Sequence, residues 1–446
     1  MNLERFLLQL EQRHPGEPEF QQSVRDLLTS VEDRIRDDFR LEHAGILERL
    51  AEPDRVFIFK VPWTTDQGKV IVNRGYRVQY NNALGPYKGG LRFHPQLTLG
   101  TVKMLAFEQV FKNSLTALSL GGAMGGADFD PYGKSDGELM RFCQSFMLEL
   151  WNILGPDIDI PGGDIGVGGR EIGYLFGMLK KLSRRHNGTF TGKGPDWGGI
   201  GLRREAPGYG IIYFVKALLD QRGEALKGKT IVVSGFGNVA HGVIAKATAL
   251  GAKVVTISGP DGCIHDPDGI TGDKLNYLVE MRASNEDKVR SYSMEFPGTA
   301  YYEGEKPWKI PCDIAIPCAI QNELDQADAK LLIDNGCQLL VEGANRPCTL
   351  AAMDVIENAP ITFIPGKAVN GGGVVVSTLE LSQNAMKMVW TDEEVDQRLQ
   401  RIMQRTFQLC GQYGRVEGGD VNYQKGANLA AFQRVAEAMI DQGTIG

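Results

Sequence analysis

The sequence predicts an α/β protein of two domains, in which a mixed α/β domain precedes a doubly wound domain built on a parallel sheet. The first observation is a period-two alternation of apolar and polar residues between residues 55 and 79, which is typical of paired strands. The second is the order strand, glycine-rich turn, helix, strand after Gly228, which opens a doubly wound fold. The third is length, because 446 residues exceed what one hydrophobic core usually serves.

The first domain is expected to extend over residues 1–200. Its hydrophobic pattern predicts charged amphipathic helices up to about residue 50, then two antiparallel strands, and then helices at 97–117 and 137–154. Three glycine-rich segments are expected to form turns that carry the unusual residues of this domain, at 85–90, 121–126 and 161–169.

The second domain is expected over residues 201–370. Apolar strands are predicted on either side of the glycine-rich turn and its helix, at 230–234 and 254–258. Later parallel strands are predicted at 313–316, 338–341 and 361–364. Residues 371–446 are predicted to be mostly helical and to pack back on the first domain.

The bulk composition argues against several classes of protein. A net charge of −7 and a pI near 5.6 give no basic surface for nucleic acid. No apolar stretch approaches the roughly 20 residues needed to cross a bilayer, and the first residues lack a signal-peptide pattern, so a cytoplasmic protein is expected. Seven cysteines without a CxxC pair predict free buried thiols, and six scattered histidines predict no metal site.

The string GFGNVA at residues 235–240 predicts a Rossmann-type dinucleotide site. GxGxxA is weak evidence by itself, but here it follows an apolar strand and opens a helix. Gly235 suits the tight turn, and Gly237 lets the backbone approach a pyrophosphate that faces the positive helix N-terminus. Ala240 permits close packing of the helix on the strand.

Asp261 follows the second strand of this unit, in the string GPDG at residues 259–262. Its carboxylate can accept hydrogen bonds from the adenine ribose and would repel a 2′-phosphate, which favours NAD over NADP. The alternative is that Asp261 only occupies a turn, because Pro-Asp-Gly explains a turn by itself.

Several long strings allow a comparison with a known family. They are GPYKGGLRF at 85–93, FEQ at 107–109, FKNSLT at 111–116, GDIGVGGRE at 163–171 and SQN at 382–384. The chain resembles the glutamate dehydrogenases, the hexameric small-subunit type of the Glu/Leu/Phe/Val dehydrogenase superfamily. The resemblance implies a homohexameric enzyme that converts glutamate, NAD(P) and water reversibly to 2-oxoglutarate, ammonium and NAD(P)H.

The resemblance also assigns site residues. The substrate-binding residues that it implies are Lys88, Gln109, Lys112, Gly162, Asn370 and Ser377. Lys88 and Ser377 are expected at the side-chain carboxylate and Lys112 at the α-carboxylate end, because each buried carboxylate needs a charged donor. Asp164 is expected to exchange protons with the amine. The cofactor-binding residues that it implies are Pro207, Gly235, Phe236, Gly237, Asn238, Val239, Pro260, Asp261, Ala319 and Asn345.

One catalytic position departs from the family pattern. The family's glycine-rich loop carries a lysine that is expected to polarise the carbonyl and activate water, whereas this chain has Met124 in the string GGAMGG. A thioether supplies no positive charge and no hydrogen-bond donor. Loss of one such group typically costs roughly 10²–10³ in turnover. Further departures are Pro207 and Ile320 for threonine, Ile200 for serine, and Gly162 and Gly371 for alanine.

Three explanations of these departures stay open. The chain can be an engineered or trapped variant, an enzyme adapted to a bulkier or less polar amino acid, or a non-catalytic paralogue that binds ligand and cofactor. Because Lys88, Lys112, Asp164 and Ser377 are intact, a weakened or retuned dehydrogenase is the favoured interpretation.

Overall fold

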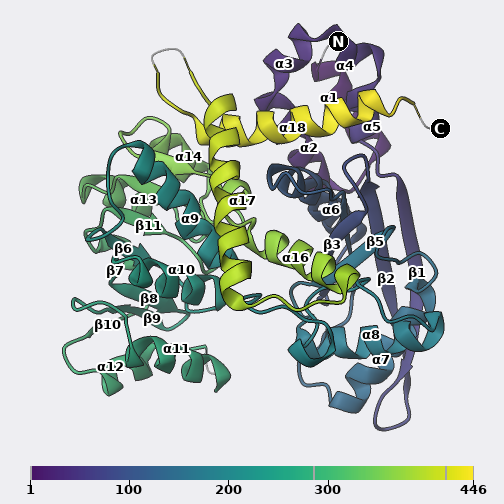
Figure 1. The fold of residues 1–446 in the computed structure, drawn as a ribbon, viewed down its shortest axis with the longest axis horizontal. Helices are drawn as coiled ribbons and strands as arrows, with labels where there is room; N and C mark the ends of the chain where they lie inside the picture. The colour runs from purple at the N-terminus through teal and green to yellow at the C-terminus, as the bar shows by residue number, and fades with distance from the viewer. Residues whose placement is uncertain (1–2, 285–286, 417–418, 445–446) are drawn as a thin grey trace. The chain divides into compact units, whose positions relative to one another are not determined.

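The structure is a computed structural model that describes residues 3–284, 287–416 and 419–444 (Figure 1). The chain divides into two compact units. The first comprises Met1–Gly201, Val376–Val395 and Asn428–Gly446, and the second comprises Leu202–Val375 and Asp396–Ala427. Residues 396–427, which were expected to pack with the first domain, therefore belong to the second unit.

The first unit is built on a five-stranded sheet in the order β1-β2-β4-β3-β5. Its strands are β1 (Arg55–Thr64), β2 (Val70–Asn81), β3 (Tyr87–Phe93), β4 (Gly122–Ala127) and β5 (Asp159–Gly163). The antiparallel pairing of β1 with β2 confirms the prediction, and β3 runs parallel to both β4 and β5. The helices of this unit are α1 (Leu3–Arg13), α2 (Pro18–Ser30), α3 (Glu32–Asp37), α4 (Phe39–His43), α5 (Ile46–Leu50), α6 (Leu99–Leu115), α7 (Asp136–Leu150), α8 (Gly169–Ser183) and the 3₁₀ turn η1 (Pro195–Trp197).

Different helices pack on the two faces of this sheet. Helices α7 and α8 pack on one face and bury a core that includes Leu91 and Phe93 of β3 (Figure 1). Within that core the rings of Phe129 and Phe142 stack with centroids 3.7 Å apart. Helix α6 covers the other face so closely that a Cβ on Gly122 would overlap Val110.

The expectation that the three glycine-rich segments form turns is only partly confirmed, because each contributes residues to a strand, β3, β4 or β5, while residues 164–168 of the third segment do form a turn. Glycine weakens an isolated strand, so local propensity pointed to turns. In the folded unit, however, a Cβ on Gly89 would overlap the carbonyl of Ala123 on the neighbouring strand. Gly126 adopts φ 146°, which other residues rarely reach. The glycines are therefore required by close packing within the sheet.

The second unit contains a parallel five-stranded sheet in the order β13-β12-β11-β6-β7. Its strands are β6 (Thr230–Val233), β7 (Lys253–Val254), β11 (Ile314–Ile316), β12 (Leu339–Val341) and β13 (Thr362–Ile364). The helices are α9 (Ala206–Gln221), α10 (Asn238–Ala249), α11 (Asp273–Ala283), α12 (Arg290–Glu295), α13 (Gln326–Asp334), α14 (Leu350–Ile356), α15 (Gly366–Val369) and the 3₁₀ turn η2 (Pro307–Lys309). This arrangement confirms the predicted doubly wound class.

One predicted strand of this unit is divided. The run expected at 254–258 is split at Val255 between β7 of the parallel sheet and β8 (Thr256–Gly259). Strand β8 pairs antiparallel with β9 (Gly262–His265), and β9 pairs with β10 (Ala300–Glu303). This small antiparallel sheet was not predicted, and its third strand, β10, lies about 35 residues after β9.

Three C-terminal helices each begin in one unit and end in the other, α16 (Gly372–Met386), α17 (Asp392–Tyr413) and α18 (Tyr423–Asp441). Within the second unit, Asp396 of α17 accepts a hydrogen bond from the Tyr213 hydroxyl at 2.5 Å and forms an ion pair with Lys246 at 2.9 Å. The ring of Phe407 packs edge-on against Phe214 at 5.3 Å. These contacts explain why most of α17 belongs to this unit.

Candidate active site

One face of the five-stranded sheet carries two of the predicted substrate residues, Lys88 and Gly162, together with the predicted catalytic position Met124. Successive residues of a strand point to opposite faces, and paired residues of neighbouring strands point to the same face. The register pairs Gly90 with Gly162 and Arg92 with Gly126. Lys88, two residues before Gly90, and Met124, two residues before Gly126, therefore share this face with Gly162.

Lys88 is the buried cation of this face. Its side chain is 6% exposed, and its Nζ lies 3.0 Å from Oγ1 of Thr191, to which it donates a hydrogen bond. A Cβ on Gly162 would lie 3.1 Å from this Nζ and 2.7 Å from the Thr191 hydroxyl. The glycine at position 162 thus makes room for the pair formed by Lys88 and Thr191.

Thr191 is a polar residue that sequence reasoning missed, because it lies about a hundred residues from Lys88 and belongs to none of the matched strings. The neighbouring backbone is held by α16, whose Glu380 accepts hydrogen bonds from the N–H groups of Gly192 and Lys193 at 2.9 and 3.2 Å. Ser377 is buried on the same helix, one turn before Glu380. These bonds tie the helix that carries Ser377 to the segment that contacts Lys88.

Helix α6 supplies the other two substrate residues predicted for this unit, Gln109 and Lys112, which are both half-buried. The amide of Gln109 donates to Oδ1 of Asn113 at 2.6 Å. Asn113 in turn donates to the carbonyls of Lys88 at 3.2 Å and Gly121 at 2.6 Å. The fully buried Asn113 therefore fixes α6 over the sheet face that carries Lys88.

Asp164, the predicted proton-exchange group, comes directly after β5 and forms an ion pair with Arg92. The Nε of Arg92 lies 2.6 Å from Oδ2 of Asp164, and the side chains are 17% and 30% exposed. A Cβ on Gly90 would lie 2.8 Å from the Cβ of Asp164. Asp164 is therefore placed over Gly90, on the face that also carries Lys88.

Met124 is 3% exposed and lies opposite Val78 of β2. In the register of the paired strands β3 and β4, Met124 lies at a level between those of Lys88 and Arg92. At the position where the family resemblance implies a lysine, the face therefore carries an uncharged thioether. The face keeps one buried ammonium group and one carboxylate.

The glycine-rich turn of the second unit lies between β6 and α10, as predicted. Gly235 has φ 76° and donates its N–H to Oγ of Ser258 at 2.9 Å. A Cβ on Gly235 would lie 3.1 Å from Cα of Ala319, so the turn packs directly on the loop after β11. Helix α10 begins at Asn238, with Val239 in its first turn, and its N-terminus can face a phosphate.

A cavity of about 270 Å³ adjoins this turn. It includes three predicted cofactor residues, and its lining is Arg204, Glu205, Phe236, Gly237, Asn238, His241, Leu278, Val279, Arg282 and Ala283. The guanidinium of Arg282 lies 5.7 Å from the centroid of the Phe236 ring. Burial lowers the pKa of His241, and Glu205 opposes that shift. Sequence reasoning missed Arg204 and Arg282, because neither belongs to a recognisable motif.

The carboxylate of Asp261 already accepts several hydrogen bonds. It accepts the N–H of Val289 at 2.9 and 3.1 Å, the N–H of Arg290 at 3.1 Å and the hydroxyl of Tyr301 at 3.3 Å. Asp261 therefore stabilises the segment before α12 in addition to occupying its turn. The neighbouring Pro260 is exposed.

The remaining predicted residues of the second unit lie near its α9 and α15 helices. Pro207 is the second residue of α9, and a Cβ on Gly373 would lie 3.2 Å from its Cγ. Nδ2 of Asn370 donates to Oδ1 of Asn345 at 3.1 Å. Among the described residues no partner reaches the buried Oδ1 of Asn370. An unsatisfied buried acceptor is costly, so this oxygen suits a donor group on a ligand.

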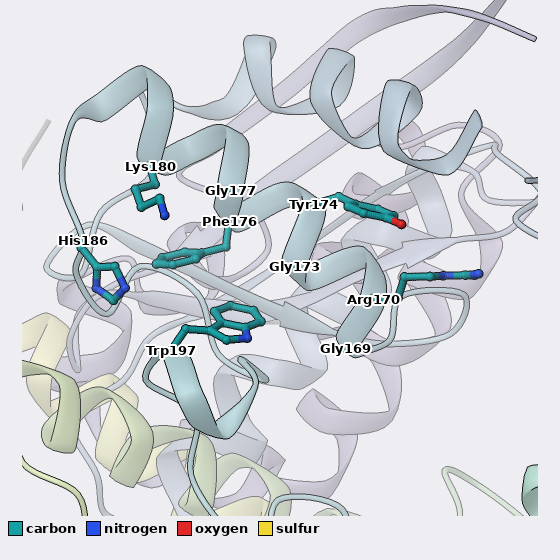
Figure 2. Close-up of a pocket in the computed structure, with 9 residues that line it drawn as sticks. All are labelled: Gly169, Arg170, Gly173, Tyr174, Phe176, Gly177, Lys180, His186 and Trp197. Atoms are coloured by element: carbon teal, nitrogen blue, oxygen red, sulfur yellow. The ribbon is translucent and has the colours of Figure 1, made fainter. Parts of the chain in front are cut away.

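A separate cavity of about 390 Å³ lies beside α8 and contains none of the predicted site residues (Figure 2). Figure 2 shows its aromatic wall, in which the Phe176 ring stacks on Trp197 with centroids 5.5 Å apart and the His186 ring meets Phe176 edge-on at 5.3 Å. Its basic side chains are Arg170 and Lys180.

The described part of the chain offers neither a cluster of metal-binding side chains nor a membrane-spanning helix. There, no three His, Cys, Asp or Glu side chains are grouped in a way that could hold a metal ion. No described helix has the length and apolar character needed to traverse a bilayer. All seven cysteines are buried as free thiols.

Comparisons with known proteins match the whole chain. The family model described as Glu/Leu/Phe/Val dehydrogenase, dimerisation domain, matches residues 53–181, and the one described as Glutamate/Leucine/Phenylalanine/Valine dehydrogenase matches residues 198–443. An NAD-specific glutamate dehydrogenase from Bacteroides fragilis is 55% identical, with 100% of both chains covered. An NADP-specific glutamate dehydrogenase from Haemophilus influenzae is 50% identical, with 99% of this chain and 98% of that protein covered.

A solved structure of a glutamate dehydrogenase superposes with a TM-score of 0.96 at 47% identity, covering 99% of both chains. The expected two-domain fold is thereby confirmed, as is the resemblance found in the sequence. The chain belongs to the Glu/Leu/Phe/Val dehydrogenase family, among its glutamate dehydrogenases.

Proposed function

We propose that this protein is an NAD(P)-dependent dehydrogenase that deaminates L-glutamate to 2-oxoglutarate and ammonium, reversibly, with a chemical step slowed by Met124. The observation that carries the proposal is the sheet face of the first unit, where the buried ammonium of Lys88 and the carboxylate of Asp164 lie on either side of Gly90. A buried cation suits a substrate carboxylate, and a partly exposed carboxylate suits proton exchange.

The residues then take the following roles. Lys88, with Thr191 beside it, and Ser377 bind the side-chain carboxylate of glutamate. Gln109, Lys112 and Asn370 bind the α-carboxylate end. Asp164 accepts a proton from the substrate ammonium and returns protons as water adds and ammonium leaves. The bound nicotinamide supplies the acceptor for the hydride, so glutamate, NAD(P)⁺ and water yield 2-oxoglutarate, ammonium, NAD(P)H and a proton.

The residues of the second unit support the cofactor assignment. Gly235 makes the tight turn, and Gly237 and the N-terminus of α10 offer backbone N–H groups to a pyrophosphate. Residues Phe236, Val239, Pro260, Ala319 and Asn345 are proposed as further contacts, with Pro207 near the nicotinamide. The free buried thiols suit a reducing compartment, and we place the protein in the cytoplasm.

The test of this function is a rate measurement on the purified full chain. Glutamate with NAD⁺, and a panel of 2-oxo acids with ammonium and NADH, are followed at the NADH absorbance band. A slow but measurable rate with glutamate or 2-oxoglutarate is expected. Complete inactivity across the panel would exclude a dehydrogenase.

Met124 favours a second candidate function, a catalytically silent subunit that still binds substrate and cofactor. Ligands that prefer the folded state raise its thermal stability whether or not they react. Stabilisation by 2-oxoglutarate and NADH without turnover would support this candidate. Turnover with a bulkier amino acid in preference to glutamate would instead indicate a retuned substrate pocket.

We infer that the cofactor is NAD in preference to NADP, because the carboxylate of Asp261 would repel a 2′-phosphate. Replacing Asp261 with asparagine keeps an oxygen that can accept the Val289 and Arg290 N–H groups but removes the charge. The ratio of kcat/KM for NADH to that for NADPH is expected to fall about tenfold, which corresponds to a charge repulsion of roughly 1.4 kcal/mol.

The matched control for this substitution is Asp268→Asn, which removes an exposed carboxylate from the same unit. It is expected to leave the NADH to NADPH ratio unchanged. An unchanged ratio in Asp261→Asn would instead show that Asp261 serves the turn and the segment before α12 alone.

We propose a homo-oligomer, and specifically the hexamer that the family resemblance implies. The surface of the first unit supports association between subunits. Strand β1 is an edge strand of the sheet, and β1 and β2 expose the apolar side chains of Val56, Ile58, Val70 and Val72. Exposed apolar strips on an edge strand are typical of interfaces. Light scattering on the purified protein is expected to give the mass of six subunits, and a monomer would contradict the proposal.

A further inference from the structure

The loop after β11 contains a carboxylate to which the proposed reaction assigns no role, that of Glu323. Its side chain is half-buried. Oε1 of Glu323 accepts the backbone N–H of Ala319 at 2.9 Å. The backbone N–H of Ile320 and the hydroxyl of Ser234 also lie close enough to this carboxylate to lower its pKa. One charged group therefore faces three donors that come from two separate segments of the chain.

Ser234 connects this carboxylate to the glycine-rich turn. It is 1% exposed and is the residue directly before Gly235. Its Oγ accepts the N–H of Cys318 at 2.9 Å, so its own hydroxyl proton is available to Glu323. The end of β6 and the loop after β11 are thereby joined, at the place where Gly235 packs against Ala319.

Backbone hydrogen bonds hold the far side of the same loop. Asn322 donates its N–H to the Arg346 carbonyl at 3.0 Å, and Leu324 donates to the Pro347 carbonyl at 2.9 Å. Because the backbone is hydrogen-bonded on both sides of Glu323, the position from which its carboxylate contacts Ala319 is fixed. Burial raises the pKa of Glu323, and the hydrogen bonds from Ser234, Ala319 and Ile320 oppose that shift.

We propose that Glu323 is a positioning residue for the nicotinamide dinucleotide, which it orients by holding the loop of Ala319 and Ile320 against Ser234 and the Gly235 turn. This inference rests on the proposed function, because it concerns the cofactor site of that function. Glu323 acts through the backbone and through Ser234. A carboxylate suits this task because its two oxygens can accept from all three donors and neither one donates.

The test replaces Glu323 with glutamine. The glutamine amide has a similar shape, but its NH₂ group would face donors where the carboxylate oxygen accepts. The dissociation constant of NADH, measured by fluorescence titration, is expected to rise about tenfold, in line with the loss of a hydrogen bond to a charged group. KM for NADH is expected to rise with it while kcat changes less. The dissociation constant of 2-oxoglutarate, whose carboxylate partners Lys88 and Lys112 lie in the other unit, is expected to stay the same.

The matched control is Glu357→Gln, which removes an exposed carboxylate at the end of α14 in the same unit. It is expected to bind NADH like the wild type. A second variant, Ser234→Ala, removes the other member of the link. In the double variant the loss of NADH affinity is expected to be smaller than the sum of the two single losses, because both substitutions break the contact between Ser234 and Glu323.

Several outcomes would overturn the inference. Wild-type NADH affinity in Glu323→Gln would overturn it, as would additive losses in the double variant. Equal weakening of NADH and 2-oxoglutarate binding, with a lower melting temperature, would assign Glu323 a general structural role. If the wild-type chain bound no NADH, the proposed function would fail together with this inference, whereas normal wild-type binding with an unaffected Glu323→Gln variant would overturn this inference alone.

Discussion

Replacing Met124 with lysine is expected to raise kcat for glutamate oxidation about 10²–10³-fold. The substitution places an ammonium group on the sheet face where Lys88 and Asp164 already lie. In the strand register its position falls between those two residues. A preorganised positive charge stabilises the oxyanion that develops on the substrate, and the loss of one such donor typically costs roughly that factor. The measurement is steady-state kinetics in both directions of the reaction at saturating cofactor.

The control for this prediction is Met124→Leu, which changes the shape of the side chain without adding charge. It is expected to leave kcat unchanged within a few-fold. If Met124→Lys also gave no increase, the remaining departures from the family pattern, Pro207 and Ile200 first among them, would have to limit the reaction. A dissociation constant for 2-oxoglutarate that stayed constant across the three proteins would show that the substrate residues are unaffected.

Replacing Lys193 with methionine is expected to lower the free energy of unfolding by about 3–5 kcal/mol, because it leaves the charge of Glu380 buried without a cation. Lys193 and Glu380 are both fully buried, and Nζ of Lys193 lies 2.6 Å from Oε1 of Glu380. The same Nζ also donates to the carbonyl of Phe190. Burial lowers the pKa of Lys193, and the charge of Glu380 and its hydrogen bond oppose that shift.

Urea denaturation of the wild type and of Lys193→Met gives this difference directly. The control is Lys216→Met, which breaks a more exposed helical pair with Asp220 and is expected to cost less than about 1 kcal/mol. The double substitution Lys193→Met with Glu380→Gln is expected to recover part of the loss, because it removes the uncompensated charge. A loss in Lys193→Met no greater than that in Lys216→Met would contradict the prediction.

The same ion pair bears on the substrate site. Glu380 accepts hydrogen bonds from the backbone of Gly192 and Lys193, directly after Thr191, which contacts Lys88. Weakening the pair is therefore expected to raise KM for glutamate as well as to lower stability. The sequence does not reveal the contact between Glu380 and Gly192, because the two residues lie almost 190 positions apart.

The amino-acid sequence by itself determined those features whose cause is local. The strand, turn and helix around Gly235 follow from an apolar run, two glycines and a helical pattern within about 20 residues. The long matched strings determined the family and pointed to Lys88, Asp164 and Met124. In each case the signal lies in consecutive residues, so no knowledge of distant partners was needed.

Only the tertiary structure decided features that depend on distant neighbours. The glycine-rich segments form strands β3, β4 and β5 because a Cβ on Gly89 or Gly122 would overlap other parts of the unit, whereas glycine by itself disfavours a strand. Thr191 beside Lys88, Arg92 beside Asp164 and Ser234 beside Glu323 are pairs between residues far apart in the chain. Local propensity and spacing carry no information about such pairs, because they form only when packing brings the segments together.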